Sequence, residues 1–278
     1  MTGLSLGISP CPNDTFTFCA IAKRLIDLKG LDFHIYLDDV ERLNTYCKKN
    51  RYDISKISTA AYPYLQEQYA LLYSGGALGR GCGPLIVARQ GIDLGQISTA
   101  RVAVPGLMTT AYLLVCLFAG QPIKVTPMRF DLIMPSVSRG EFDFGVIIHE
   151  GRFTYHKYGL SLLLDLGQWW EEKTGLPIPL GAIAIKRDLG QDLARKIDQL
   201  ISESLLLAWG HPQITTDYVR EHAQEMDETV IKKHIDLYVN QYTKNMGEEG
   251  KMAVFTLFTM GAKMGILPKL QYTPMAYA

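Results

Sequence analysis

A stiff, polar turn lies close to the start of the chain, in the segment SPCPNDTF at Ser9–Phe16. Pro10 and Pro12 fix their own φ angles and favour extended conformations in the residues that precede them. Asn13 or Asp14 is then placed to cap the helix-like run that follows. Such a turn directs free backbone N–H groups at one point, which suits an anionic ligand. A tight strand-to-helix connection without a ligand explains the same residues equally well.

Three more groups of candidate site residues come at the ends of strand-like segments. They are Lys56, Ile57 and Ser58 at the end of one strand, Thr109 and Thr110 after a second, and His149 after a third. Ligands of open α/β sheets bind beyond the carboxyl ends of the strands, so we expect these groups to converge on one site. Each group also has a simpler explanation. The hydroxyls can serve only as helix N-caps, and the histidine can make a structural hydrogen bond.

Other catalytic motifs are incomplete. His149 and His156 lie seven residues apart, so HEGRFTYH is not the HExxH pattern of a zinc site, and no metal site is predicted. The Gly-rich run SGGALGRGCG at residues 74–83 lacks both the ending of a Walker loop and the GxGxxG spacing. Cys11, which lies between two prolines, is a conceivable nucleophile, although a structural thiol is the preferred interpretation.

The elements that must position these residues alternate between strands and helices. Strands are predicted at 4–8, 32–37 and 53–57, with helices near 15–28 and 39–50 between them. A further strand is predicted at 84–88, and a second series combines strands at 101–104, 124–128 and 142–148 with helices at 109–118 and 132–139. This βαβ rhythm is typical of parallel sheets.

The order of these elements predicts two lobes joined by two crossings of the chain. We expect residues 1–90 and 180–278 to form the first lobe and residues 91–179 the second. The crossings are expected near 91–100 and 175–180. From residue 189 to 264 the pattern is mostly helical, and this tail is expected to cover the first lobe. A cleft between two such lobes is a common place for a small ligand.

The composition excludes several classes of function. The chain has 278 residues, of which 47% are hydrophobic and 20% charged, and its formal net charge is zero. Balanced charge argues against a nucleic-acid surface, and no apolar run is long enough to insert into a membrane. The five cysteines contain no CxxC pair, and without an export signal they are interpreted as reduced thiols of a cytoplasmic protein. The oligomeric state is left open.

Several blocks of sequence together match one enzyme family. The spacing of SPCPNDTF, KIS, SGGALGRGCGPL, VPGLMTTAY, GVIIHEGRFTY, DLGQWWEEKTGLPIPLG and YVNQYT resembles that of the 1,4-dihydroxy-6-naphthoate synthase family. The match runs from about residue 4 to about residue 267. It implies a two-lobe α/β fold of the type II periplasmic-binding-protein-like kind, with a ligand cleft between the lobes.

The same resemblance implies an activity. It is a lyase reaction in menaquinone biosynthesis, which converts the carboxylated substrate cyclic dehypoxanthine futalosine to 1,4-dihydroxy-6-naphthoate and dihydroxyacetone. No metal or redox cofactor is implied. The alternative is a non-catalytic protein that binds a small carboxylate on the same fold.

The family's site residues map onto positions already singled out. The catalytic base falls on His149, and the substrate-binding segments fall on Lys56, Ile57 and Ser58 and on Thr109 and Thr110. A histidine with its ordinary pKa, about 6.5, is a sufficient proton acceptor near neutral pH. His156 is the nearest rival, while the other histidines, at 34, 211, 222 and 234, fall in surface or tail segments. Further candidates for the substrate cleft are Ser9, Asn13, Asp14, Arg80 and Arg152, and the two arginines could instead brace the lobes.

Overall fold

The computed structural model of the chain describes residues 3–224 and 227–277 and contains two β-sheets. The first sheet has the order β2-β1-β3-β11-β4, and β5 pairs with the other end of β11. Strands β1, β2 and β3 are parallel, and β11 runs antiparallel to its neighbours. The bounds are β1 Leu4–Ile8, β2 Phe33–Leu37, β3 Ile54–Ser58, β4 Tyr69–Leu71, β5 Ala77–Gly79 and β11 Ile178–Lys186.

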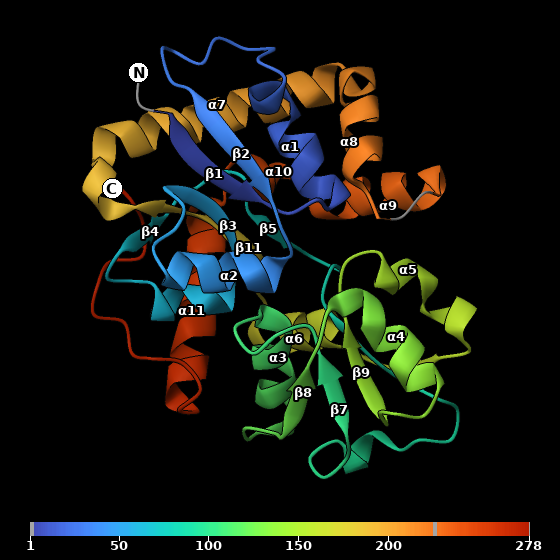
Figure 1. Cartoon of the computed structure of the whole chain (residues 1–278). Coiled ribbons are helices and arrows are strands. Elements are labelled where there is room, and N and C mark those ends of the chain that lie inside the picture. The colour runs from blue at the N-terminus through green and yellow to red at the C-terminus, as the bar shows by residue number, and fades with distance from the viewer. Residues whose placement is uncertain (1–2, 225–226, 278) are drawn as a thin grey trace.

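The second sheet has the order β10-β6-β9-β7-β8. Strands β7, β8 and β9 are parallel, whereas β6 is antiparallel to both β9 and β10. The bounds are β6 Leu85–Ala88, β7 Val102–Val104, β8 Val125–Pro127, β9 Phe144–Ile147 and β10 Ser161–Asp165. The sheets and the helices that cover them are called the first and second lobes, and Figure 1 shows the first above the second. The expected two-lobe α/β fold is confirmed.

One predicted boundary is wrong. The expectation that the first lobe extends to residue 90 fails at β6, which pairs with β9 and β10 of the second sheet. The first crossing is therefore residues 80–84, not 91–100. The apolar run at 85–88 identifies a buried strand, but periodicity does not reveal which sheet will take it. The second crossing lies between the end of α6 (Leu166–Thr174) and the start of β11 at Ile178.

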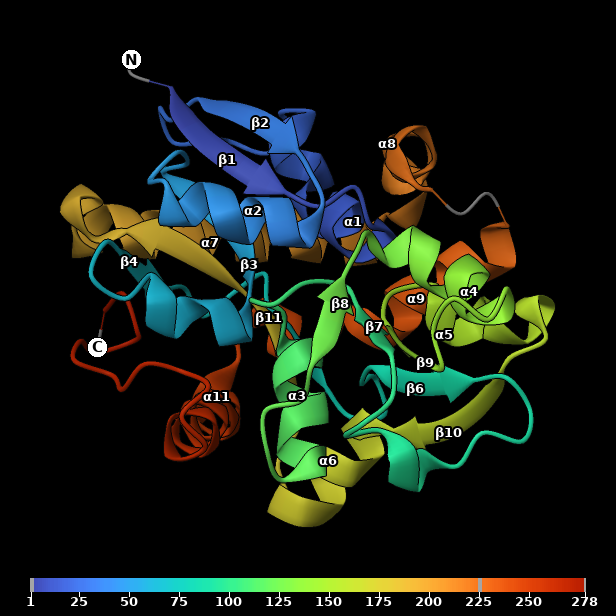
Figure 2. The ribbon, with the colours of Figure 1, turned by 60° about the horizontal axis from the view of Figure 1, so that its bottom comes forward.

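Helices cover both sheets, and the four predicted between the strands are present, although the first ends at Ala22 rather than near residue 28 and the helices at Gly151–Thr154 and Leu166–Thr174 were not predicted. The bounds are α1 Pro12–Ala22, α2 Val40–Lys48, α3 Thr110–Ala119, α4 Phe130–Ser138, α5 Gly151–Thr154, α7 Gln191–Gly210, α8 Thr216–His222, α9 Glu228–Tyr238, α10 Gln241–Lys244 and α11 Gly247–Lys263. The C-terminal helices α7, α8 and α9 pack on α1 of the first lobe (Figures 1 and 2). Within the described part of the chain, no helix has the length and apolar character needed to cross a membrane.

The start of α1 differs from the prediction. The helix begins at Pro12, and its N-cap is Cys11 in an extended conformation with φ −64° and ψ 146°. Neither Asn13 nor Asp14 is the cap, because both already lie in the first turn. Pro12 at the first helical position explains the early start, since its fixed φ suits a helix and its missing N–H is not needed there.

The Gly-rich run at residues 74–83 allows close packing of the backbone. A Cβ on Gly83 would lie 2.2 Å from the backbone of Gly167, the second residue of α6. A Cβ on Gly79 would lie 2.8 Å from the side chain of Asn240. Only residues without a side chain let these segments approach so closely, and the first crossing is held against α6 in this way.

Candidate functional site

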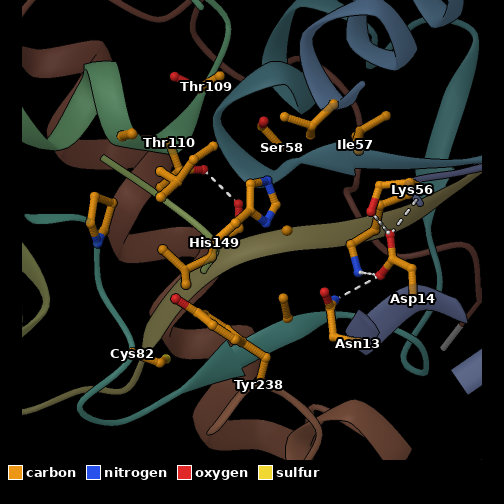
Figure 3. A pocket seen from close by; sticks show the side chains of 18 of the residues that line it. Asn13, Asp14, Lys56, Ile57, Ser58, Cys82, Thr109, Thr110, His149 and Tyr238 are labelled. Atoms are coloured by element: carbon orange, nitrogen blue, oxygen red, sulfur yellow. Dashed lines mark hydrogen bonds and ion pairs between the residues drawn. The ribbon is translucent and has the colours of Figure 1, made fainter. Parts of the chain in front are cut away.

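A cavity lies between the two lobes and brings most of the predicted residues together (Figure 3). The first lobe contributes Ser9, Asn13, Asp14, Lys56, Ile57 and Ser58, and the second contributes Thr109, Thr110 and His149. Its other lining residues are Val40, Ala77, Cys82, Pro84, Ala111, Ile148, Leu180, Gly181, His234 and Tyr238. The lobes also touch beside the cavity, where the Glu41 carboxylate accepts a hydrogen bond from the backbone N–H of Met108 at 3.2 Å.

A buried ion pair lies at the centre of the first-lobe wall. The ammonium group of Lys56 is 2.6 Å from Oδ1 of Asp14, and the two residues are 5% and 1% exposed. Lys56 also donates to the backbone carbonyl of Gly75 at 3.0 Å. Oδ2 of Asp14 accepts from the hydroxyl of Ser9 at 2.7 Å and from its backbone N–H at 3.2 Å. The anion at the start of α1 is thus Asp14 itself, where the sequence suggested a ligand.

Ser58 is held at the end of β3 by Asn44, which lies on α2. The side-chain oxygen of Asn44 accepts from the backbone N–H of Ser58 at 2.8 Å, and its amide nitrogen donates to the hydroxyl of Ser58 at 3.1 Å. Because this hydroxyl already accepts, its own proton is left to donate into the cavity. The side chain of Ile57 is fully buried in the core and adds only an apolar surface to the wall.

Thr109 and Thr110 lie at the start of α3. Thr109 is its N-cap, and the hydroxyl accepts from the N–H of Tyr112 at 3.2 Å. The hydroxyl of Thr110 donates to the carbonyl of Leu180 on β11 at 2.8 Å and accepts from the N–H of Ala60 at 3.2 Å. Both hydroxyls are therefore occupied within the protein. The backbone N–H groups of Thr110 and Ala111, which begin the helix, are the donors that remain for a ligand.

His149 stands just beyond β9, at the carboxyl end of the strand, as predicted. Its backbone is in the left-handed region with φ 55°, which is uncommon for a residue with a side chain and marks a conformation imposed by its surroundings. Nδ1 of the imidazole lies 3.3 Å from the sulfur of Cys11, across the gap between the lobes. The ring also packs against Phe130 of α4, with 5.0 Å between ring centroids.

Burial controls the protonation of this pair. It lowers the pKa of His149 to about 4, although the Asp14 carboxylate opposes the shift. The imidazole is thus neutral near pH 7 and able to accept a proton. Burial, with help from the carboxylate of Glu150, raises the pKa of the Cys11 thiol well above its usual value. Cys11 is consequently protonated, and a thiolate nucleophile is not favoured here.

Comparison with known proteins identifies the family. The family model described as "Menaquinone biosynthesis" matches residues 4–263. The chain belongs to this menaquinone biosynthesis family. A curated protein of Thermus thermophilus named 1,4-dihydroxy-6-naphthoate synthase is 47% identical, over 96% of each chain. Another of that name from Streptomyces coelicolor is 42% identical, over 99% of this chain and 98% of the relative. The resemblance drawn from the sequence blocks is confirmed.

Solved structures agree with the expected fold. A protein from Archaeoglobus fulgidus superposes on this member of the menaquinone biosynthesis family with a TM-score of 0.89 at 34% identity, covering 95% of this chain and 98% of that one. The periplasmic aliphatic sulphonate binding protein SsuA of Escherichia coli superposes with a TM-score of 0.68 at 11% identity, covering 98% and 93%. The second likeness shows a shared periplasmic-binding-protein-like fold.

Two residues predicted for the cleft of this family member lie elsewhere. Arg80 is in the first crossing, where it is paired with Glu249 and donates to the carbonyl of Gly175. Arg152 is paired with Asp165 and donates to the carbonyl of Gly83. Both side chains brace the crossings and their surroundings, and neither lines the cavity. Arginines in Gly-rich or loop segments can reach many places, so sequence position did not distinguish bracing from ligand contact.

Of the other histidines, one was placed wrongly by the sequence analysis. His156, the nearest rival as a base, is exposed and does not line the cavity. His234 of α9, which the sequence placed in the tail, is 1% exposed and lines the cavity. Four residues after His234, Tyr238 lines it too. A polar and an aromatic residue four apart on one helical face were the available signal for this pair.

Proposed function

We propose that this chain catalyses the conversion of cyclic dehypoxanthine futalosine to 1,4-dihydroxy-6-naphthoate with release of dihydroxyacetone. The curated relatives of that name and the neutral imidazole of His149 in the cavity between the lobes support this proposal. The observation that carries it is His149 itself. It is a base free of charge near neutral pH, set on a constrained backbone at the point where the two lobes meet.

In this reaction His149 is the general base. It takes a proton from the substrate, the carbon–carbon bond to the three-carbon unit breaks, and the ring that remains becomes aromatic. The proton then passes to the departing dihydroxyacetone unit, so no oxidant is consumed. Positioned proton transfer of this kind contributes about 10²–10⁴-fold to a rate. Aromatisation of the ring makes the reaction free energy more favourable.

The walls of the cavity offer donors for the anionic and hydroxylated parts of the substrate. The N–H groups of Thr110 and Ala111 at the start of α3 suit the carboxylate, because a helix N-terminus carries partial positive charge. The proton of the Ser58 hydroxyl and the third N–H of the Lys56 ammonium are further donors, since the partners described above leave them unused. Five free and buried cysteines fit a reducing compartment, so we place the reaction in the cytoplasm.

The competing proposal is a binding protein for a small carboxylate on the same fold, a role suggested by the likeness to SsuA. A protein that only binds a carboxylate needs donors in its cleft but has no need of a base, whereas His149 is a neutral imidazole on a constrained backbone. Among the described residues that line the cavity, Lys56 is the one lysine and is neutralised by Asp14, and two neutral histidines line the same space. These features favour catalysis over simple anion capture.

One assay tests the proposal directly. Purified protein is mixed with cyclic dehypoxanthine futalosine, and 1,4-dihydroxy-6-naphthoate is followed by its absorbance and fluorescence, with dihydroxyacetone measured separately in equal amount. A heat-denatured sample controls for spontaneous breakdown. Tight binding of the compound with no product would favour the competing proposal.

A further inference from the structure

A second histidine of the cavity has a hydrogen-bonding state fixed by its neighbours. His234 lies on α9 in the first lobe, and its ring is nearly parallel to that of His149, with 6.1 Å between centroids and an angle of 8°. The residue is 1% exposed. Its Nε2 is 3.0 Å from Oδ1 of Asn13. Its Nδ1, on the other side of the ring, is buried and has no hydrogen-bond partner among the described residues.

The direction of the bond between His234 and Asn13 follows from the ion pair next to it. Asp14, paired with Lys56, is a carboxylate that can only accept. The side-chain nitrogen of Asn13 therefore donates to Asp14 Oδ1, at 2.8 Å. The side-chain oxygen of Asn13 is thereby turned toward His234. Because an amide oxygen can only accept, Nε2 of His234 must carry the hydrogen.

The other ring nitrogen is consequently an acceptor. Burial, reinforced by His149 and Lys56, lowers the pKa of His234 well below its usual value, so the imidazole is neutral. A neutral imidazole has one hydrogen, and here Nε2 holds it. Nδ1 presents a lone pair that is shielded from solvent and costly to leave without a donor. A ligand in the cavity can supply that donor.

We infer that Nδ1 of His234 accepts a hydrogen bond from a hydroxyl group of the substrate. The inference rests on the proposal that the cavity between the lobes is the substrate site, and it holds whichever residue is the base. A hydroxyl satisfies the lone pair, whereas a carboxylate or ketone oxygen at the same place would set two lone pairs against each other. His234 thus selects for a hydroxylated group on its side of the cavity and directs the substrate carboxylate away from itself.

Two substitutions separate the roles of the two ring nitrogens. The amide oxygen of Asn, one bond from Cγ, can occupy the place of Nδ1, so His234→Asn keeps an acceptor there but loses the bond to Asn13. The amide nitrogen of Gln can occupy the place of Nε2, so His234→Gln keeps the bond to Asn13 but has no acceptor at Nδ1. The two variants are matched in chemistry and opposite in what they remove.

Binding is measured without turnover, in a His149→Asn background, by calorimetry with cyclic dehypoxanthine futalosine. His234→Gln is expected to weaken binding about tenfold or more, the effect of one lost hydrogen bond in a buried site, and His234→Asn to weaken it less. Equal affinities, or a greater loss in the Asn variant, would overturn the inference. If the background protein itself does not bind the compound, the proposed function fails instead.

A measurement that leaves His234 in place guards against misfolded variants. Protein labelled with ¹⁵N-histidine is expected to show His234 protonated on Nε2 in the free state. In the His149→Asn protein, which should bind the compound without converting it, saturation should move the Nδ1 resonance of His234 in the direction of a hydrogen-bonded acceptor. An unchanged Nδ1 resonance, or a proton found on Nδ1 in the free protein, would show that this nitrogen does not receive the substrate hydroxyl.

Discussion

The two walls of the cavity are built in opposite ways. On the first lobe, Asp14 is surrounded by donors from Ser9, Asn13 and Lys56, and a separate pair of hydrogen bonds ties Ser58 to Asn44. On the second lobe, His149 is held on a left-handed backbone and touches the protein through one thiol and ring contacts. The buried charges of the first wall, on Asp14 and Lys56, neutralise each other, whereas the second wall presents the neutral imidazole of His149, a base.

This difference assigns separate tasks to the two lobes. A network whose charges are already neutralised keeps its shape whether or not the substrate is present, and it can position a substrate accurately. The neutral imidazole of His149, whose pKa is lowered by burial, is instead able to accept a proton from the substrate. We therefore expect changes in the first wall to alter stability or binding, and a change at His149 to alter turnover.

The largest effect is expected at His149. His149→Asn keeps hydrogen-bonding capacity but removes the basic nitrogen, so kcat should fall about 10²–10⁴-fold while the substrate still binds. Steady-state assays of naphthoate formation measure the fall, and calorimetry measures the binding. His156→Asn, an exposed histidine outside the cavity, is the control and should leave kcat unchanged. If His149→Asn keeps most of its turnover, the second wall does not supply the base.

The buried ion pair should dominate the stability of the first wall. Lys56→Met leaves the Asp14 carboxylate buried without its cation and should lower the free energy of unfolding by about 3–5 kcal/mol. Urea unfolding measures the loss. Lys186→Met is the matched control, because its pair with Asp53 at 3.0 Å is more exposed and should cost less. Equal losses of unfolding free energy in both variants would contradict the prediction that the buried Lys56–Asp14 pair contributes more than the more exposed one.

The pH dependence of the reaction should reflect the lowered pKa of His149. Neutral imidazole is the active form, so kcat/KM is expected to stay constant from neutral pH down to about 5 and to fall through about pH 4. A pH profile measured with buffers of constant ionic strength tests this. A fall centred near 6.5 would mean that the histidine is solvated in the working enzyme.

The same lowered pKa predicts how stability changes with pH. His149 binds a proton more readily in the unfolded chain, with its pKa of about 6.5, than in the folded protein, with its pKa of about 4. The stability that accompanies the neutral form is therefore fully present above pH 6.5 and is lost as the pH falls toward 4. Urea unfolding at several pH values should show a shallower loss for His149→Asn than for the parent. If the unfolding free energy of both proteins falls equally with pH, His149 does not contribute to the pH dependence of stability.

The smallest effects should come from the hydroxyls, and they should differ between the walls. Ser58→Ala removes a free donor and should weaken substrate binding by about 1–3 kcal/mol, seen as a higher KM. Thr110→Val removes a hydroxyl that already links α3 to β11 and Ala60, so it should instead lower the unfolding midpoint. A higher KM in Thr110→Val with no loss of stability would show that its hydroxyl leaves those partners for the substrate.

Much of the site could be predicted because it depends on local patterns. Strands β7 and β9 are short apolar runs, β3 mixes apolar and polar residues, and polar candidates lie at or just beyond the carboxyl end of each. Ligands bind beyond the carboxyl ends of parallel strands, so the place of each group at the edge of its own sheet could be predicted without knowledge of distant contacts. This holds although β3 belongs to the first sheet and β7 and β9 to the second.

The residues that could not be predicted depend on contacts between distant segments. His234 meets Asn13 across 221 residues of sequence, and Cys11 meets His149 across 138. The four-residue spacing of His234 and Tyr238 places them on one face of α9, but it does not show that this face meets the cavity. The sheet membership of β6 was predicted wrongly for a related reason, since its partners β9 and β10 come 56 or more residues later.

The position of β11 has a consequence for how the chain is made. This strand inserts between β3 and β4, so the first sheet lacks an interior strand until residue 186 has been synthesised. The second sheet is complete at Asp165, from one uninterrupted stretch that begins at Leu85. Domains form as units during synthesis when their residues are contiguous. The second lobe can therefore fold on the ribosome first. The first lobe contains the N-terminus, but its sheet can be completed only after β11 has been synthesised.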